Sequence, residues 1–363
     1  MLETRLTELL GCRYPIVQTA MGWVADPKLV AATGNAGGFG FLAGATIPPD
    51  EIERDILAVK ELTSANFGVN FHMYQPNAAE IVDLVIEHGV KAVSYSRSPG
   101  PEFIRKLKDA GVICMPTVGL PKHAIKAVEL GADVVTVQGG EGGGHTGAIP
   151  TTVLLPQVVN AVAGKAPVVA AGGFKDGRGL VAALAFGAEG IAMGTRFLLT
   201  SDSPVPADTL KAYLECRDPG VIIRSTAMDG LPQRMIMNEV LTELERAGPL
   251  KKLLLAIRNG LAFRAHTGAS LFGLLKSAIA MQRDDGLTPA QAIMSANAPM
   301  IIQRAMVDGK PGEGVLPSGQ VAGVIDELLS CEALINSIVA EAEEKLVALN
   351  ARAQRSESHV AGV

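Results

Sequence analysis

ELGADVV (residues 129–135) is one of four similar phrases that decide the fold expected for this chain of 363 residues. The other three are EHGVKAV (87–93), DAGVICM (109–115) and AFGAEGI (185–191). Each phrase has the pattern of a helix end, a glycine that caps it and an apolar strand. A unit of helix and strand that recurs in this way predicts alternating β and α elements around a parallel sheet.

The same alternation extends outward from these phrases through the N-terminal part of the chain. Eight apolar runs are expected to form strands, at residues 14–19, 38–43, 67–71, 92–96, 112–118, 134–139, 167–173 and 190–199. These runs are too apolar for a sheet with one face in water. Eight such units predict an α/β fold of the (β/α)8 TIM-barrel type. An open doubly wound sheet is the alternative, but it would not require eight strands.

The regular pattern ends at TSDSPVP (200–206), and the segment after it has only helical periodicity. We therefore expect a helical insertion after strand eight, placed before the closing helix of the barrel. The expected divisions are a barrel at 1–205, the helical insertion at 206–304, a return segment with the closing helix at 305–350, and a flexible tail at 351–363.

The composition limits the partners of the protein. The chain has a formal charge of -5, a pI near 5.8 and 48% hydrophobic residues. An acidic globular protein of this kind has no general attraction for phosphate backbones or anionic membranes. No apolar run reaches the roughly 18 residues of a membrane span, and the N-terminus lacks the apolar stretch of a signal peptide. We expect no nucleic-acid partner and no membrane partner.

The cysteines lie far apart in the sequence, with no C-x-x-C pair and no histidine at metal-ligand spacing. They are Cys12, Cys114, Cys216 and Cys331. We expect them to be reduced packing residues of a cytoplasmic protein, and we expect no metal site. The number of subunits is left open, and an oligomer is compatible with the sequence.

QGGEGGGHTG (138–147) is the most unusual stretch, and two phosphate-binding motifs almost fit it. Gly139 to Thr146 has the spacing of a phosphate loop, but histidine stands where that motif needs lysine. Gly142 to Gly147 spells G-x-G-x-x-G, but Pro150 follows where a dinucleotide-binding motif needs a helix. The glycines of this loop must therefore serve a different site.

The ligand site of such a barrel lies at the carboxyl ends of its strands. TAMGW (19–23), Asn70, the glycine-rich loop, AAGGFKDGRG (170–179) and MGTRF (193–197) are all expected there. Glycines that follow strands seven and eight leave backbone N–H groups free to hold a phosphate dianion. The residues concerned are Gly172, Gly173, Gly194 and Thr195, with ordinary turn glycines as the alternative interpretation.

His145 is the histidine that lies inside the glycine-rich loop, at the catalytic end of a strand. Imidazole changes its protonation near neutral pH, so this residue is a candidate general base. The alternative is a histidine satisfied by backbone groups, and His72 after the third strand is the competing candidate. Glu141 is expected only to cap or to orient.

Several kinds of chemistry are not supported by the sequence. No metal triad, no G-x-S-x-G motif and no carboxylate pair stands out at the strand ends. A phosphate cradle with one base implies a bound cofactor. Pyridoxal phosphate would need a lysine at a strand end, and the nearest, Lys175, lies in the phosphate loop itself. A flavin is the better expectation.

The chain resembles the nitronate monooxygenase (2-nitropropane dioxygenase-like) superfamily of FMN-dependent barrels. The segments that carry the resemblance are MGWV (21–24), GNAGGFGFLAGAT (34–46), FGVN (67–70), GGEGGGHTG (139–147), AAGGFKDGRGLVAAL (170–184), MGTRFLLT (193–200) and SGQVAG (318–323).

The resemblance implies a flavoprotein oxidoreductase with FMN across the top of the barrel and His145 as the catalytic base. The residues implied for FMN are Met21 and Gly22 by the ring, Asn70 and Gln138 at its polar edge, Gly143 and Gly144 beside it, and Gly172, Gly173, Gly194 and Thr195 on the phosphate, with Ala171 as a further cofactor-binding residue. The residues assigned to the substrate are His72, Ser318, Gly319 and Gln320.

Two departures from the family pattern concern the substrate. Thr117 and Gln138 stand where many nitronate-oxidising members are expected to have a lysine and an aspartate. The loop GGEGGGHTG and the segment PSGQVAG look more like two sibling groups. These are the flavin enoyl-acyl-carrier-protein reductases and the CoA-thioester dehydrogenases of bacterial steroid-ring degradation, which the whole chain resembles.

Three functions therefore compete. The first is a nitronate monooxygenase-like oxidase of a small carbon acid that uses dioxygen. The second is a dehydrogenase or reductase of an acyl-CoA, or an enoyl-acyl or quinone reductase, with NAD(P)H or NAD as co-substrate. The third is a flavin-binding protein without turnover. The insertion offers cations for CoA phosphates, with solvated helix faces as the commoner alternative; they are Lys251, Lys252, Arg258, Arg264 and Arg283.

Overall fold

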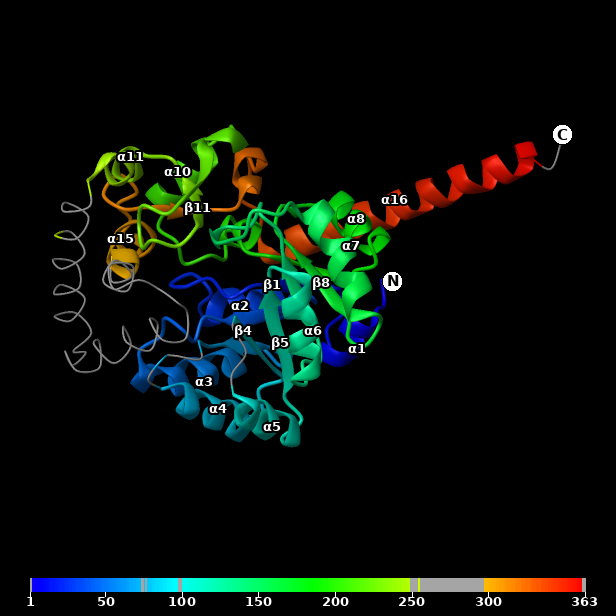
Figure 1. Ribbon diagram of the computed structural model, residues 1–363, viewed down its shortest axis with the longest axis horizontal. Coiled ribbons are helices and arrows are strands. Elements are labelled where there is room, and N and C mark those ends of the chain that lie inside the picture. Colours follow the sequence, from blue (N-terminus) through cyan, green and yellow to red (C-terminus); the bar gives the residue numbers. More distant parts are fainter. Residues whose placement is uncertain are drawn as a thin grey trace.

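The computed structural model of the protein describes residues 2–72, 75, 77–96, 100–248, 254 and 297–360 (Figure 1). Eight parallel strands close into a barrel in chain order, and the last pairs with the first. They are β1 (Ile16–Gln18), β2 (Phe39–Leu42), β3 (Gly68–Asn70), β4 (Ala92–Ser96), β5 (Ile113–Val118), β6 (Val135–Gln138), β8 (Val168–Ala171) and β9 (Gly190–Met193). The prediction of a TIM barrel is confirmed, and each strand lies within one of the eight predicted runs.

Helices alternate with these strands, as the recurring phrases predict. They are α2 (Pro27–Asn35), η1 (Pro49–Glu51), α3 (Ile52–Leu62), α4 (Ala78–Glu87), α5 (Pro101–Asp109), α6 (Pro121–Glu129), α7 (Thr151–Val162) and α8 (Gly177–Ala185). The start of α2 shows the local rule: the Asp26 side chain accepts a hydrogen bond from Leu29 N at 2.9 Å, and Pro27 occupies the first turn.

The barrel interior is filled by inward-pointing strand residues and closed at one end by helix α1 (Arg5–Leu10). Leu6 and Leu10 of α1 are fully buried in the same apolar cluster as Val17, Phe39 and Phe41. Thr4, which precedes α1, donates its hydroxyl to Glu189 O at 2.8 Å, just before β9 begins. This helix therefore covers the amino ends of the strands and leaves the carboxyl ends for the ligand site.

The eighth predicted strand is too long, because residues 194–199 do not continue it. Strand β9 ends at Met193, and α9 (Thr195–Leu198) follows as a short buried helix. Arg196, only 4% exposed, donates through Nη1 to Leu199 O at 3.3 Å and to Glu327 O at 3.2 Å. A short apolar run such as residues 194–199 is compatible with a buried strand and with a buried helix, so its periodicity could not distinguish the two.

The inserted segment is not helical throughout, and that expectation was wrong for residues 222–236. This part of the chain contains α10 (Ala207–Glu215), η2 (Pro219–Val221), β10 (Ile222–Ser225), β11 (Gln233–Ile236), α11 (Glu239–Arg246) and α15 (Asn297–Met306). Strands β10 and β11 form an antiparallel hairpin. Its sequence signals are two short β-prone runs, VIIRS and QRMIM, on either side of the turn residues MDGLP.

Strand β11 is the centre of a second sheet that joins the insertion to the barrel. It pairs with β10, with β12 (Leu316–Pro317) and with β7 (Gly144–His145), which lies in the loop after β6. In Figure 1 the labelled insertion elements α10, β11, α11 and α15 gather on one side of the barrel. The chain returns through η3 (Gln320–Val324) to the closing helix α16.

Helix α16 (Cys331–Val360) closes the barrel and then continues away from its body (Figure 1). Its first half packs closely on α8, where Gly177 N donates to Glu341 Oε2 at 2.8 Å. A tail starting at residue 351 was expected, but the helix runs on to Val360. The segment NARAQRSESH contains no glycine or proline, so nothing in it ends a helix. Among the described helices, none is long and apolar enough to cross a membrane.

Candidate active site

The glycine-rich loop after β6 is folded against its own strand. Gln138, the last residue of β6, donates through Nε2 to His145 O at 3.0 Å, and Thr146 Oγ1 donates to Gly139 O at 3.1 Å. These two bonds bring the ends of the loop together. His145 is thereby held directly beyond the carboxyl end of β6, which is where the chemistry of such a barrel is expected.

Glu141 anchors the middle of this loop to helix α7. Its carboxylate accepts hydrogen bonds from Thr151 N at 2.9 and 3.1 Å and from Thr151 Oγ1 at 2.8 Å. A carboxylate at the first helical residue accepts a hydrogen bond from an otherwise free N–H group, and its negative charge interacts favourably with the helix dipole. The expectation that Glu141 caps or orients agrees with this geometry.

The glycines of the loop are required by close approaches of other backbone. A Cβ on Gly143 would lie 2.6 Å from Gly319 N and 2.7 Å from Ser318 C. A Cβ on Gly139 would lie 2.6 Å from Thr151 N. Side chains at these positions would push apart the loop, the return segment and α7.

Free backbone N–H groups gather at the ends of β8 and β9. Gly172 and Gly173 have φ values of 99° and 85°, so the chain turns sharply after β8. Within the described ranges, no protein acceptor receives a hydrogen bond from the backbone N–H of Gly172, Gly173, Gly194 or Thr195. Such a set of N–H groups, with no side chain in the way at three of them, suits a phosphate dianion.

His145 has a buried carboxylate as its partner. Its Nε2 atom lies 2.9 Å from Oδ2 of Asp229, which is 3% exposed, whereas the imidazole itself is 58% exposed. Asp229 also accepts from Leu231 N at 3.0 Å and from the side chain of Gln233. The ring is therefore held on one side and open to solvent on the other.

Arg234 binds the loop to the insertion. Its Nε donates to Gly140 O at 2.8 Å and its Nη1 donates to Ile222 O at 2.8 Å. Burial lowers the pKa of this guanidinium, and the nearby charge of Arg224 lowers it further. The residues opposite each other in the two strands are Gln233 with His145 and Arg234 with Gly144.

The return segment reaches the same place. Gly319 N donates to Thr195 Oγ1 at 2.9 Å, and Gln320 N donates to Glu141 O at 2.9 Å. Ser318 is fully buried, and its hydroxyl donates to Gly319 O at 3.0 Å. Ser318, Gly319 and Gln320 therefore lie between the glycine-rich loop and the end of β9.

The other predicted cofactor residues lie at neighbouring strand ends. A Cβ on Gly194 would lie 3.4 Å from Met21 Sδ, and one on Gly22 would lie 2.8 Å from Thr46 Cγ2. Asn70 donates through Nδ2 to Ser94 O at 3.1 Å. Ala171 is the β8 residue paired with Gln138 of β6.

His72, the competing base, lies on the exposed loop after β3. Its backbone N–H donates to Gln75 Oε1 at 2.7 Å. The loop of His145 follows β6, so the two histidines come from different sides of the barrel mouth. The predicted CoA-binding cations at 251, 252, 258, 264 and 283 lie outside the described residues.

Asp229, Gln233 and Arg234 were missed by the sequence reasoning. Asp229 precedes Gly230, and an Asp-Gly pair has the pattern of an ordinary turn. The sequence signal that could have been used is the pair of β-prone runs that form the hairpin of β10 and β11. No pattern in one sequence identifies the loop with which its second strand pairs.

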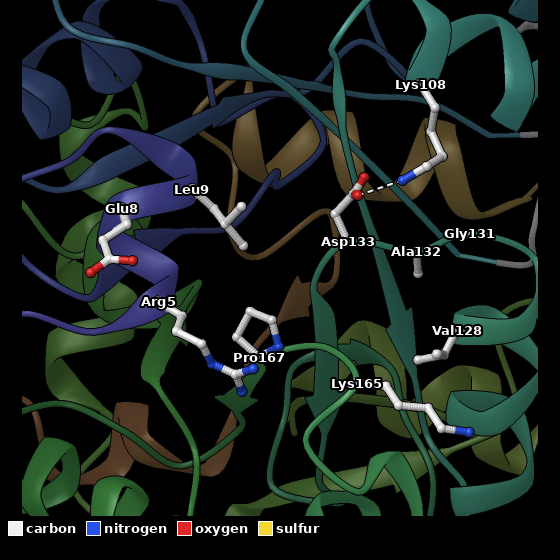
Figure 2. Close-up of a pocket in the computed structure, with 10 residues that line it drawn as sticks. All are labelled: Arg5, Glu8, Leu9, Lys108, Val128, Gly131, Ala132, Asp133, Lys165 and Pro167. Atoms are coloured by element: carbon white, nitrogen blue, oxygen red, sulfur yellow. Dashed lines mark hydrogen bonds and ion pairs between the residues drawn. The ribbon is translucent and has the colours of Figure 1, made fainter.

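A cavity of about 590 Å³ lies at the opposite end of the barrel (Figure 2). Arg5, Glu8 and Leu9 of α1 line it, together with residues that precede β6 and β8, such as Asp133 and Pro167. These residues lie at the amino ends of the strands. In TIM barrels the residues at this end stabilise the fold, and the active site lies at the carboxyl ends. We do not assign the reaction to this cavity. Among the described residues, no group of three or more His, Cys, Asp or Glu side chains is placed to hold a metal ion.

The model of the nitronate monooxygenase family matches residues 3–341 of the chain. The protein belongs to this family. Nitronate monooxygenase family members are flavin-dependent in general, and the relatives found are oxidoreductases, so this member is an oxidoreductase. Its fold is a closed eight-stranded barrel with a second sheet of β7, β10, β11 and β12 beside it.

Three relatives describe the neighbourhood of this family member. The (3aS,4S,5R,7aS)-5-hydroxy-7a-methyl-1-oxo-octahydro-1H-indene-4-carboxyl-CoA dehydrogenase of Rhodococcus jostii is 48% identical over 352 residues, 96% of this chain and 98% of that protein. A probable nitronate monooxygenase of Staphylococcus saprophyticus is 33% identical over 290 residues, 67% of this chain and 81% of that protein. The structure of FabK from Thermotoga maritima matches with a TM-score of 0.78 at 29% identity. The match covers 97% of this chain and 100% of the FabK chain.

Proposed function

We propose that this member of the family is an FMN-dependent dehydrogenase of a hydroxylated CoA thioester. The observation that carries the proposal is that the barrel and the insertion build the site together, through the contact of His145 with Asp229. The Rhodococcus dehydrogenase is similar over 96% of the chain, whereas the Staphylococcus relative is similar over 67% of it. Similarity over both parts of the site favours the CoA thioester over a nitronate.

FMN suits the groups that the chain offers. Four free backbone N–H groups lie beyond β8 and β9, and they can donate hydrogen bonds to the oxygens of the single phosphate of FMN. Beside them, Gly143 and Gly144 present a backbone without side chains, against which a planar ring would pack. Asn70 and Gln138 supply amide groups at adjacent strand ends. We assign the phosphate to Gly172, Gly173, Gly194 and Thr195, and the ring to Met21, Gly22, Asn70, Gln138, Gly143 and Gly144, with Ala171 as a further cofactor-binding residue.

The chain's own contribution is a positioned base. Oxidation of a secondary hydroxyl removes the O–H proton and the hydride on the carbinol carbon, and a C=O bond forms. His145 would take the proton, since its imidazole is held on one side and open on the other. FMN, when bound, would accept the hydride and pass two electrons to a nicotinamide, NAD or NADP. His72 and the return segment, Ser318 to Gln320, are proposed to border the substrate.

The partners that this proposal requires are small molecules: the CoA thioester and a nicotinamide co-substrate. The four cysteines are free thiols, which fits a reducing compartment, and we place the protein in the cytoplasm on that basis.

The test is anaerobic mixing of the FMN-loaded protein with three probes. A hydroxylated octahydroindene-carboxyl-CoA thioester, of the kind named for the Rhodococcus relative, should bleach the flavin absorbance, and NAD or NADP should restore it. Propionate 3-nitronate should cause little bleaching and, in air, little oxygen consumption. Rapid oxygen consumption with the nitronate, together with no bleaching by the thioester, would overturn the proposal in favour of an oxidase. A protein that takes up no FMN on reconstitution would overturn the cofactor assignment.

A further inference from the structure

We infer that Asp229 is a positioning residue that fixes the tautomer of His145, so that Nδ1 is the atom that takes the substrate proton. The inference rests on the proposed function only for the identity of the substrate whose proton is taken. The tautomer of His145 is a property of the protein alone. It assigns part of the acid-base machinery to the inserted segment and not to the barrel.

The hydrogen bonds of Asp229 determine which ring nitrogen carries the proton. Its Oδ1 accepts from Leu231 N at 3.0 Å, and its Oδ2 accepts from the Gln233 amide and faces His145 Nε2 at 2.9 Å. An ionised carboxylate can only accept hydrogen bonds. The Leu231 N–H and the Gln233 amide already donate to this carboxylate, so both of its oxygens act as acceptors. The ring nitrogen that faces it must then carry a hydrogen.

A neutral imidazole has one N–H group and one lone pair. With the hydrogen on Nε2, the lone pair lies on Nδ1. Within the described residues, Nδ1 makes no hydrogen bond to the protein, and the side chain is 58% exposed. The free lone pair is therefore on a ring whose other edge is held by a side chain that is 3% exposed.

The other charged groups near the loop are occupied elsewhere. The Arg234 guanidinium donates to Gly140 O and Ile222 O, and the Glu141 carboxylate accepts from Thr151. Asp229 is thus the carboxylate that reaches the ring in the described part of the chain. The backbone of His145 is fixed independently, by its pairing with Gln233 and by the bond from Gln138. A change at Asp229 should alter the ring without unfolding the loop.

Asp229→Asn is the most informative variant, because the side chain keeps its size and shape while the group that faces His145 Nε2 can change from a hydrogen-bond acceptor to a donor. The asparagine amide can donate to Nε2, and the hydrogen of the ring would then move to Nδ1. In an analogous serine-protease case, the same change holds the histidine in the wrong tautomer and lowers kcat by roughly 10⁴. The matched control is Asp218→Asn, because Asp218 lies in the same insertion and its side chain accepts from Gly220 N in a local turn.

The experiment is NMR of ¹⁵N-histidine-labelled protein, with His145→Gln used to assign the ring signals. We expect wild type and Asp218→Asn to show a protonated Nε2 and a bare Nδ1, and Asp229→Asn to show the reverse. With the thioester, Asp229→Asn should lose kcat by about 10²–10⁴-fold while KM changes little. A bare Nε2 in the wild type would overturn the inference without any variant, and an unchanged tautomer in folded Asp229→Asn would do so as well. If the tautomers are as expected but no thioester is oxidised, the inference stands and the proposed function fails.

Discussion

Gln233 of β11 lies opposite His145 of β7 in an antiparallel pair, although the two residues belong to different parts of the fold. The same glutamine donates its side-chain amide to Asp229. One residue of the insertion therefore fixes both the backbone of the candidate base and the carboxylate that faces its ring. The insertion is consequently part of the candidate active site, and the two parts of the chain should respond together to mutation.

Replacing His145 by alanine should lower turnover strongly and leave the fold intact. The imidazole is 58% exposed, so its removal creates no buried cavity. A general base contributes about 10²–10⁴-fold to a rate, and kcat should fall by that amount while FMN remains bound. The measurement is steady-state turnover beside the flavin spectrum.

His123→Ala is the matched control, because His123 is an exposed histidine on α6 and does not belong to the loop after β6. It should leave kcat unchanged. Unchanged turnover in His145→Ala would instead indicate a different base, such as His72.

Gly143→Ala should weaken FMN binding and destabilise the protein. The new Cβ would lie 2.6 Å from Gly319 N and 2.7 Å from Ser318 C, and neither backbone atom can move alone. We expect a loss of about 1–3 kcal/mol in the free energy of unfolding. Urea unfolding measures the stability, and fluorescence titration measures the flavin affinity.

Gly147→Ala provides the comparison within the same loop. No atom lies within 4 Å of a Cβ at this position, and Gly147 is not among the glycines with positive φ. The free energy of unfolding should change by less than about 0.5 kcal/mol. Equal effects of the two substitutions would mean that loop flexibility, and not the approach of the return segment, explains the need for glycine.

The barrel strands were predictable because each is a local apolar run between a helix cap and a polar loop. The phrase ELGADVV contains the end of α6, its glycine and the start of β6. The failures occurred where local pattern carries two meanings. MGTRFLLT contains both a strand and a buried helix, and the bonds of Arg196 to two carbonyl groups decide between them.

The candidate site was predictable only in its barrel half. Gly143, Gly172 and Gly173 are conspicuous as glycines, and His145 is conspicuous among them. Asp229 has the sequence of a turn, and its partner is determined by strand pairing between distant segments. Such pairing depends on the tertiary structure, which hydrophobic periodicity does not encode.

The cysteine thiols should be inert in the native protein. Burial raises the pKa of Cys12, Cys114 and Cys331 to about 12, and it raises the pKa of Cys216 as well. The thiolate is the reactive form, so reaction with a disulfide reagent at pH 8 should be on the order of 10²–10³-fold slower than for a free thiol. All four should react at once in denaturant. One thiol that reacts rapidly in the native state would show that its segment opens locally.

Asp176 is a cap whose contribution should depend on pH. Its Oδ1 accepts from Arg178 N at 3.2 Å and from Gly179 N at 3.3 Å at the start of α8. Burial alone would raise its pKa, but hydrogen bonds from the Arg178 side chain and Gly179 N outweigh burial, and the pKa is lowered. A carboxyl whose folded pKa lies below its unfolded value stabilises the fold above the unfolded pKa. That stabilisation is lost as the pH falls through the folded pKa.

Asp176→Ala should therefore lower the free energy of unfolding by about 1 kcal/mol at pH 7. The difference from wild type should shrink below about pH 4, where the unfolded carboxyl and then the folded one become protonated. Asp176→Asn is the comparison, because its amide oxygen still accepts from Gly179 N but carries no charge. Its deficit at pH 7 should be smaller than that of Asp176→Ala. Urea titrations at pH 7 and at pH 3.5 measure these differences, and a deficit for Asp176→Ala that is the same at both pH values would mean that the charge contributes nothing.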